Sequence, residues 1–188
     1  MRYILWAEGS SDAGLREVLN WLLAQNHVDV SEAIAVEHGD YPTVEDLLEV
    51  EWANLLFLHK DADSDKEENG QGPKTRRKQI ERNVKENFPP TVCVVPVQET
   101  EAWLLVQTEL PLASIEIQAR PKEKLKAILE EKQGCPMNFK EFSRQRTLLW
   151  AQLAQNPEAL HRLESLPVFQ QLVTDTTEAI QRHGLTQH

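Results

Sequence analysis

Short apolar runs alternate, over the first half of the chain, with segments whose apolar residues recur at helical spacing. Four runs have the length and aliphatic content of buried strands: 3–7, 33–37, 55–58 and 91–96. Three segments between them read as amphipathic or capped helices: 12–26, 42–51 and 75–87. Strands that alternate with helices predict a parallel sheet covered on both faces.

The pattern changes after about residue 110. One helix is predicted at 99–106, and four more follow without a convincing strand among them: 121–132, 147–155, 157–163 and 167–182. We therefore expect an α/β fold, with a mainly parallel, Rossmann-like, four-stranded sheet flanked by helices. Residues 1–110 would form this core, and residues 111–188 a helical extension packed on it. Residues 64–74, polar and glycine-rich, predict a mobile loop.

Composition narrows the class of protein. With 188 residues and 40% apolar content, the chain is long enough for one domain with a real core. No run approaches a membrane span, and the opening residues turn acidic too soon for a signal peptide. Cys93 and Cys135 are isolated, which argues against a disulfide scaffold or a zinc site and favours the cytoplasm.

The net charge of −10 means that the molecule as a whole repels polyanions. Any contact with nucleic acid would be weak for this chain alone, and would depend on local basic segments, bound metal or a partner. Arg76 and Arg77 lie in the more basic of two such segments and have the geometry to grip a phosphate. Glutamates are interleaved with both segments, so an ordinary solvated helix face is the favoured interpretation of both.

Acidic residues follow three of the predicted strands. Glu8 follows the first, Asp61 and Asp63 follow the third, and Glu99 and Glu101 follow the fourth. The carboxyl ends of parallel strands share one edge of a sheet, where α/β folds place their sites. In an extended chain Asp61 and Asp63 would point the same way. Converging carboxylates need a cation between them, and oxygen ligands suit Mg²⁺ or Mn²⁺.

The segment after the first strand has two interpretations. Gly9 permits a tight turn or a close approach of a phosphate, and a helix that begins near Ser10 would attract an anion. Alternatively Ser10, Ser11 or Asp12 only caps the following helix.

Alternatives also exist for the second acidic segment. A calcium loop that begins at Asp61 fails, because Lys66 stands where glycine is needed and Gly72 where a bidentate glutamate is needed. A phosphatase with Asp61 as nucleophile remains a minor alternative. His59 is expected to be a surface or half-buried residue, and Glu99 could simply be a first-turn acid of its helix.

These motifs, in this order, resemble the TOPRIM fold of topoisomerases, primases and OLD-type nucleases. The segment from Glu99 to Leu105 is similar to a small TOPRIM-like family often encoded beside ATPases in bacterial defence loci. In that family the helical tail also carries an arginine, here Arg146, and a Pro-Phe-like segment at 167–169.

The resemblance implies a nuclease that depends on Mg²⁺ or Mn²⁺, with an ATPase as partner. Glu8, Asp61 and Asp63 would hold the metal and carry catalysis, Glu99 or Glu101 would complete the ligand set, and Glu8 could instead be the general base. Gly9, Ser10, Arg76 and Arg77 would contact the substrate. Tyr3 and Tyr41 lack a topoisomerase context, so hydrolysis is favoured over strand passage. The alternative is a non-catalytic module that binds a partner protein.

Overall fold

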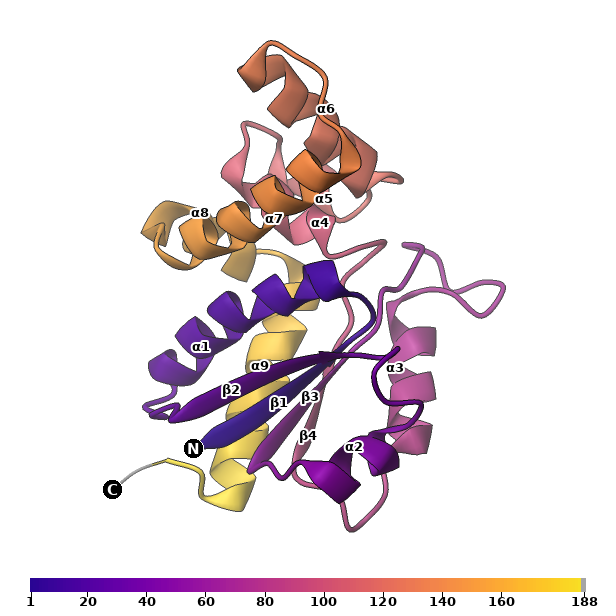
Figure 1. Cartoon of the computed structure of the whole chain (residues 1–188), viewed down its shortest axis with the longest axis vertical. Helices are drawn as coiled ribbons and strands as arrows, with labels where there is room; N and C mark the ends of the chain where they lie inside the picture. Colours follow the sequence, from indigo (N-terminus) through magenta and orange to yellow (C-terminus); the bar gives the residue numbers. More distant parts are fainter. Residues whose placement is uncertain (187–188) are drawn as a thin grey trace.

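The computed structural model describes residues 1–186, except for the side chains of Ser10 and Ser11. Its centre is a four-stranded parallel sheet in the order β2-β1-β3-β4, which confirms the predicted α/β fold (Figure 1). The strands are β1 (Arg2–Ala7), β2 (Glu32–Glu37), β3 (Leu55–His59) and β4 (Thr91–Val94). β1 and β3 are the central pair, with Leu5 opposite Phe57 and Trp6 opposite Leu58.

Helices follow each strand and make up most of the second half of the chain. Before residue 110 they are α1 (Leu15–Gln25), α2 (Val44–Val50), α3 (Pro73–Asn83) and α4 (Glu101–Leu104). In the second half they are α5 (Leu112–Ile115), α6 (Pro121–Gln133), α7 (Phe139–Ala154), α8 (Pro157–Glu164) and α9 (Pro167–His183). Two short 3-10 helices, Ser10–Gly14 and Leu105–Gln107, adjoin α1 and α4. None of the helices within residues 1–186 is both long enough and apolar enough to cross a bilayer.

Each face of the sheet buries its own set of side chains because successive residues of a strand point to opposite faces. Leu5 and Phe57 face α1 and α9, whereas Ile4, Leu56 and Leu58 face α2 and α3. Figure 1 shows α1 and α9 on one side of the sheet, and α2 and α3 on the other. The carboxyl ends of the strands point toward the remaining helices.

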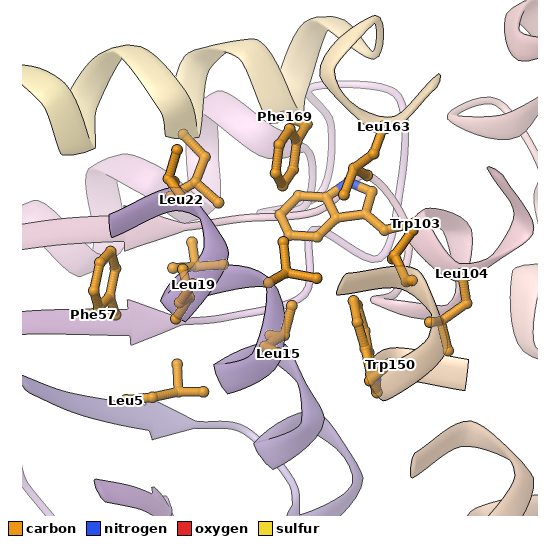
Figure 2. Packing of buried hydrophobic residues seen from close by; sticks show 14 of the residues in the cluster. Leu5, Leu15, Leu19, Leu22, Phe57, Trp103, Leu104, Trp150, Leu163 and Phe169 are labelled. Atoms are coloured by element: carbon orange, nitrogen blue, oxygen red, sulfur yellow. The ribbon is translucent and has the colours of Figure 1, made fainter. Parts of the chain in front are cut away.

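The last helix joins the helical part of the chain to the sheet. α9 runs back along β4 and covers the same sheet face as α1. Its Phe169 packs edge-on against Trp103 of α4, with ring centroids 5.1 Å apart (Figure 2). Trp150 of α7 belongs to the same cluster, which extends without a break from Leu5 to Ile180. Residues before and after 110 therefore share one hydrophobic core.

Several element boundaries differ from the sequence prediction, and those at the starts of α7 and α3 have identifiable causes. α7 begins at Phe139 rather than at 147, because Asn138 and Glu141 form a capping box at its start. A charged residue, Arg146, occupies a buried position of this helix and hides its apolar periodicity. α3 begins at Pro73, within the predicted mobile loop, and the Glu67 carboxylate accepts hydrogen bonds from its first free amides.

Gly14 is required for close packing of the segment before α1 against α7. A Cβ atom built on it would lie 2.2 Å from Cδ1 of Trp150, whose side chain is fully buried and cannot withdraw. We expect Gly14→Ala to lower the free energy of unfolding by about 1–3 kcal/mol through overpacking. Urea denaturation measures the change.

The matched control is Gly39→Ala, because a Cβ at Gly39 meets no atom within 4 Å. Its effect should stay within about 0.5 kcal/mol. Equal stability of the two variants would show that α7 is not packed against Gly14 as described.

Candidate metal centre

The ends of β1 and β3 interlock through side chains at the carboxyl edge of the sheet. The backbone N–H of Asp61 donates to Glu8 Oε2 at 2.9 Å, and the backbone N–H of Glu8 approaches His59 Nδ1 at 3.2 Å. Both contacts follow from the parallel register, which brings residues that come just after each strand to the same level. Two of the predicted metal ligands, Glu8 and Asp61, are therefore neighbours.

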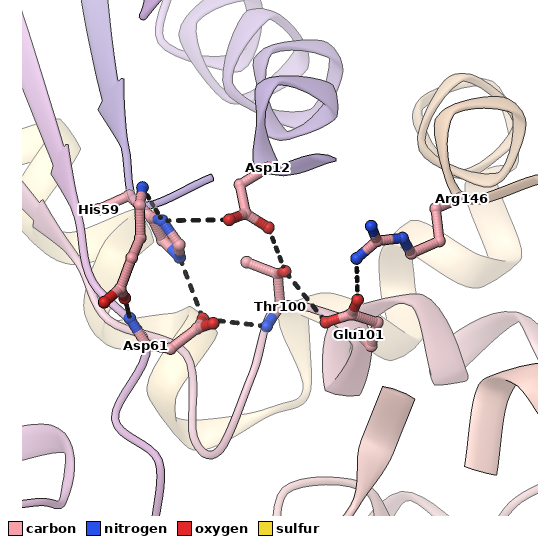
Figure 3. Close-up of polar contacts among 7 residues, drawn as sticks. Asp12, His59, Asp61, Thr100, Glu101 and Arg146 are labelled. Carbon is pink, nitrogen blue, oxygen red and sulfur yellow. Dashed lines mark hydrogen bonds and ion pairs between the residues drawn. The ribbon is translucent and has the colours of Figure 1, made fainter. Parts of the chain in front are cut away.

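His59 lies at the middle of this edge and its side chain is 0% exposed. Its Nε2 lies 3.2 Å from Asp61 Oδ1, and its Nδ1 lies 3.9 Å from Asp12 Oδ2 (Figure 3). Because Nδ1 accepts from the Glu8 amide, the ring proton belongs on Nε2, where it is donated to Asp61. Atoms of Asp12, His59 and Asp61 that could bind a metal lie within 4.8 Å of one another.

The connection from β4 to α4 ties two of these carboxylates together. The hydroxyl of Thr100 donates to Asp12 Oδ1 at 2.7 Å, and its backbone N–H donates to Asp61 Oδ1 at 3.1 Å. Thr100 is 2% exposed; its bond to Asp12 is buried and its bond to Asp61 is partly buried. Asp12 is thereby fixed to the sheet edge although it belongs to the 3-10 helix before α1.

A buried ion pair closes the centre on the side of the helical region. Arg146 of α7 pairs with Glu101 Oε1, and the two side chains are 6% and 4% exposed. The other oxygen, Glu101 Oε2, lies 3.4 Å from the Thr100 hydroxyl. The guanidinium also lies over the Phe142 ring, 5.2 Å from its centroid. Arg146 thus adds a permanent positive charge beside the carboxylates (Figure 3).

The carboxylates change one another's protonation. Burial raises the pKa of Asp61 above its usual value, with Asp12 and Glu101 adding to the effect and His59 opposing it. Burial also raises the pKa of Glu99, followed by repulsion from Glu101 and Asp61. A raised carboxyl pKa means that the ionised form is disfavoured, here first by burial and then by neighbouring negative charge. A bound divalent cation would stabilise the ionised form.

His59 responds to the same charges in the opposite direction. Burial lowers its pKa, but Asp61, Asp12 and Glu8 outweigh burial and the net shift is upward. A second ring proton would have to sit on Nδ1, where the Glu8 amide already donates. Protonation of His59 therefore requires that amide to turn away, and Asp12 Oδ2 is then the nearest acceptor.

Asp63 does not join this group. β3 ends at His59, and Asp63 has a left-handed backbone with φ of 59°, so the strand alternation expected for Asp61 and Asp63 does not continue. Its backbone N–H donates to Gln98 O, and its carboxylate pairs with Arg76 Nη2 at 2.5 Å.

Two of the predicted substrate-binding residues, Arg76 and Arg77, already form ion pairs within the chain, and Gly9 has an ordinary backbone conformation. Arg76 pairs with Asp63, while Arg77 pairs with Glu81 and with Asp175 of α9. Gly9 has φ of −147°, an extended conformation that any residue adopts, so the backbone there does not require glycine. The side chain of Ser10 lies outside the described part of the chain.

Three residues of the centre, Asp12, His59 and Thr100, were not identified as members of it from the sequence. Asp12 was one of three candidate helix caps, but its carboxylate makes no capping hydrogen bond and accepts a hydrogen bond from Thr100 instead. His59 was expected to be at least half exposed and is buried. Its alternation with Leu55 and Phe57, which face the core, was the available signal. Thr100 carried no signal, because its role depends on two partners, Asp12 and Asp61, from distant segments of the chain.

A separate cavity of about 660 Å³ lies beside the edge strand β4, between α3 and α9. Val95, Val97 and Leu172 line it, together with Arg77. Cys93 also lines it, and burial raises the pKa of this thiol to about 11, so it is not a reactive thiolate. None of the residues of the acidic centre lines this cavity, so it does not bear on the chemistry of that centre.

The Arg146–Glu101 pair should be important for stability. We expect Arg146→Met to lower the free energy of unfolding by about 3–5 kcal/mol, because Glu101 is left as an uncompensated buried charge. Adding Glu101→Gln should restore part of the loss. Arg144→Met, on the exposed side of the same helix, is the control and should change stability by less than about 0.5 kcal/mol. A loss in Arg146→Met no larger than in the control would contradict the pairing.

Comparison with known proteins adds no assignment to this geometry. No protein-family model, no curated protein and no solved structure matches the chain. The resemblance to TOPRIM proteins remains a prediction from the motifs, and the chemistry of the centre has to be argued from its own residues.

Proposed function

We propose that the chain is a metal-dependent phosphodiesterase, a nuclease that uses Mg²⁺ or Mn²⁺ at the acidic edge of its sheet. The observation that carries this proposal is the convergence of Glu8, Asp12 and Asp61, from separate segments, around buried His59. Oxygen atoms dominate the available ligands, as hard divalent cations require. Burial, with Asp12 and Glu101 adding to it, raises the pKa of Asp61, and a bound cation would stabilise its ionised form.

In this proposal Asp12 and Asp61 hold the cation, which would polarise a phosphate oxygen and neutralise charge that develops on it. His59 orients Asp61 through a hydrogen bond from Nε2, and Arg146 forms an ion pair with Glu101 that keeps this carboxylate from binding the cation. Glu8 uses Oε2 to accept the Asp61 amide, so Oε1 remains to bind the cation or to accept a proton from the attacking water. Asp63 would contribute only if Arg76 released it.

The expected substrate is a nucleic acid that the chain alone holds weakly. Its net charge is −10, and the two arginines best placed to grip a phosphate are both paired with carboxylates. Affinity would therefore come from the bound cation or from a partner such as an ATPase. Both cysteines are free thiols, which agrees with the proposed cytoplasmic location.

The same arginine pairs favour a second candidate function. If Arg76 and Arg77 are only structural, an acidic surface of this kind suits a non-catalytic module that binds a protein partner. Calorimetry with Mn²⁺ separates the two functions: absence of binding would support the module, and micromolar binding lost in Asp61→Asn would support the enzyme.

The test of activity is nicking of supercoiled plasmid DNA, and cleavage of single-stranded RNA, in the presence of Mn²⁺. We expect Asp61→Asn and Asp12→Asn each to lower the rate by on the order of 100-fold or more, beyond the loss typical of residues that only support a ligand. Asp29→Asn is the control, because Asp29 is exposed at the opposite end of the sheet.

Asp63→Asn distinguishes two versions of the site. Retained activity would support the group formed by Asp12, His59 and Asp61, whereas full loss would place Asp63 among the ligands and require its pair with Arg76 to open. Full activity in both Asp61→Asn and Asp12→Asn would exclude the proposed centre.

Stabilisation by metal should increase with pH. A carboxyl group whose pKa is raised by folding favours the folded state below its unfolded pKa, and this contribution is lost as pH rises through the folded pKa. Asp61, with an ordinary value of 3.8, behaves in this way. A cation that binds the ionised carboxylate restores the stability that ionisation removes. Mn²⁺ should therefore hardly raise Tm near about pH 4.5, where the carboxyl group is largely protonated, and should raise it clearly near about pH 7.5.

Differential scanning fluorimetry in a pH series measures this dependence. Asp61→Asn should remove the metal-dependent increase in Tm, and Asp29→Asn should keep it. An increase that is the same at both pH values would show that the cation binds elsewhere.

A further inference from the structure

Thr100 contacts both aspartates of the candidate centre. It belongs to the turn between β4 and α4, it is 2% exposed, and it reaches Asp12 with its side chain and Asp61 with its backbone. Figure 3 shows it between the two carboxylates. Asp12 and Asp61 belong to segments far apart in the sequence, so a residue that touches both sets their relative orientation.

The Thr100 hydroxyl has one hydrogen to donate and two carboxylates nearby. Asp12 Oδ1 lies at 2.7 Å, whereas Glu101 Oε2 lies at 3.4 Å. Glu101 is already neutralised by Arg146 on its other oxygen. The hydrogen therefore goes to Asp12, and this bond turns the second oxygen, Asp12 Oδ2, toward His59 Nδ1 at 3.9 Å.

The backbone of Thr100 acts on Asp61 in the same way. Asp61 Oδ1 receives the Thr100 N–H at 3.1 Å and also the His59 Nε2–H at 3.2 Å. Two donors occupy that oxygen. Within the described residues no donor makes a hydrogen bond to Asp61 Oδ2. Each aspartate thus has one oxygen that is engaged and one that is available.

We propose that Thr100 is a positioning residue, which leaves Asp12 Oδ2 and Asp61 Oδ2 free to bind a divalent cation. This inference rests on the proposed metal-dependent function. Threonine suits the role because its branched Cβ restricts the rotation that aims the hydroxyl. Partners that hold a ligand from outside the coordination sphere typically change metal affinity by about 10–100-fold when they are removed.

The experiment is calorimetric titration of the full chain with Mn²⁺. Thr100→Val deletes the hydroxyl at nearly constant volume and should weaken Mn²⁺ binding by about 10–100-fold. Thr100→Ser keeps the donor and should restore affinity close to the wild-type value. Thr91→Val is the matched control, because the Thr91 hydroxyl donates to Pro89 O at 2.8 Å at the other end of β4.

Circular dichroism of each variant confirms folding, and the electron paramagnetic resonance spectrum of bound Mn²⁺ reports the symmetry of its ligands. We expect that spectrum to change in Thr100→Val and not in Thr91→Val. If the valine variant does not fold, Thr100→Ala carries the same expectation.

Wild-type affinity in Thr100→Val, or failure of Thr100→Ser to restore binding, would overturn the inference while leaving the metal-dependent function in place. Unfolding of both hydroxyl-free variants would also overturn it, since Thr100 would then be needed for folding rather than for affinity. A wild-type chain that binds no Mn²⁺ would instead exclude the proposed function itself.

Discussion

Parallel strands end at one edge, so every acidic residue that follows a strand adds negative charge to the same small region. In this protein Glu8, Asp12, Asp61, Glu99 and Glu101 gather there, close to a buried core. Burial, and after it repulsion between the carboxylates, raises the pKa of Asp61 and of Glu99 above the usual values. Hydrogen bonds and a positive charge have to compensate these carboxylates, and this requirement determines the arrangement of the other residues at this edge.

The compensating contacts come from elements spread along the whole chain. His59 of β3 donates to Asp61, Thr100 after β4 binds two aspartates, and Arg146 of α7 neutralises Glu101. Because α7 lies beyond residue 110, the helical region contributes directly to the charge balance of the sheet edge. Its attachment through the shared core, with Trp103 against Phe169, holds Arg146 in place. Folding of the helical region and formation of the acidic centre are therefore linked.

Two basic residues that follow β3, Arg76 and Arg77, form ion pairs within the chain, although their positive charge alone would suggest contact with a phosphate. Arg76 and Arg77 each neutralise an acidic residue of the same chain, one in the loop and one on α9. The Arg77–Asp175 contact joins α3 to α9 beside the open edge of β4. With those two side chains engaged, the proposed cation at the acidic edge would be the simplest source of attraction for a phosphate. This links the proposed metal dependence to the weak affinity expected for nucleic acid.

The sequence by itself determined the α/β class, the four strands and most of the helices, because apolar periodicity reports burial one element at a time. It also determined that carboxylates such as Glu8 and Asp61 would come to one edge, since that follows from parallel strand direction alone. Tertiary structure decided which of them meet. Asp63 has a left-handed backbone and pairs with Arg76, and Asp12, one of three candidate helix caps, accepts a hydrogen bond from Thr100 instead. Such choices depend on side-chain partners from distant segments, and local patterns contain no information about contacts that exist only after the segments pack.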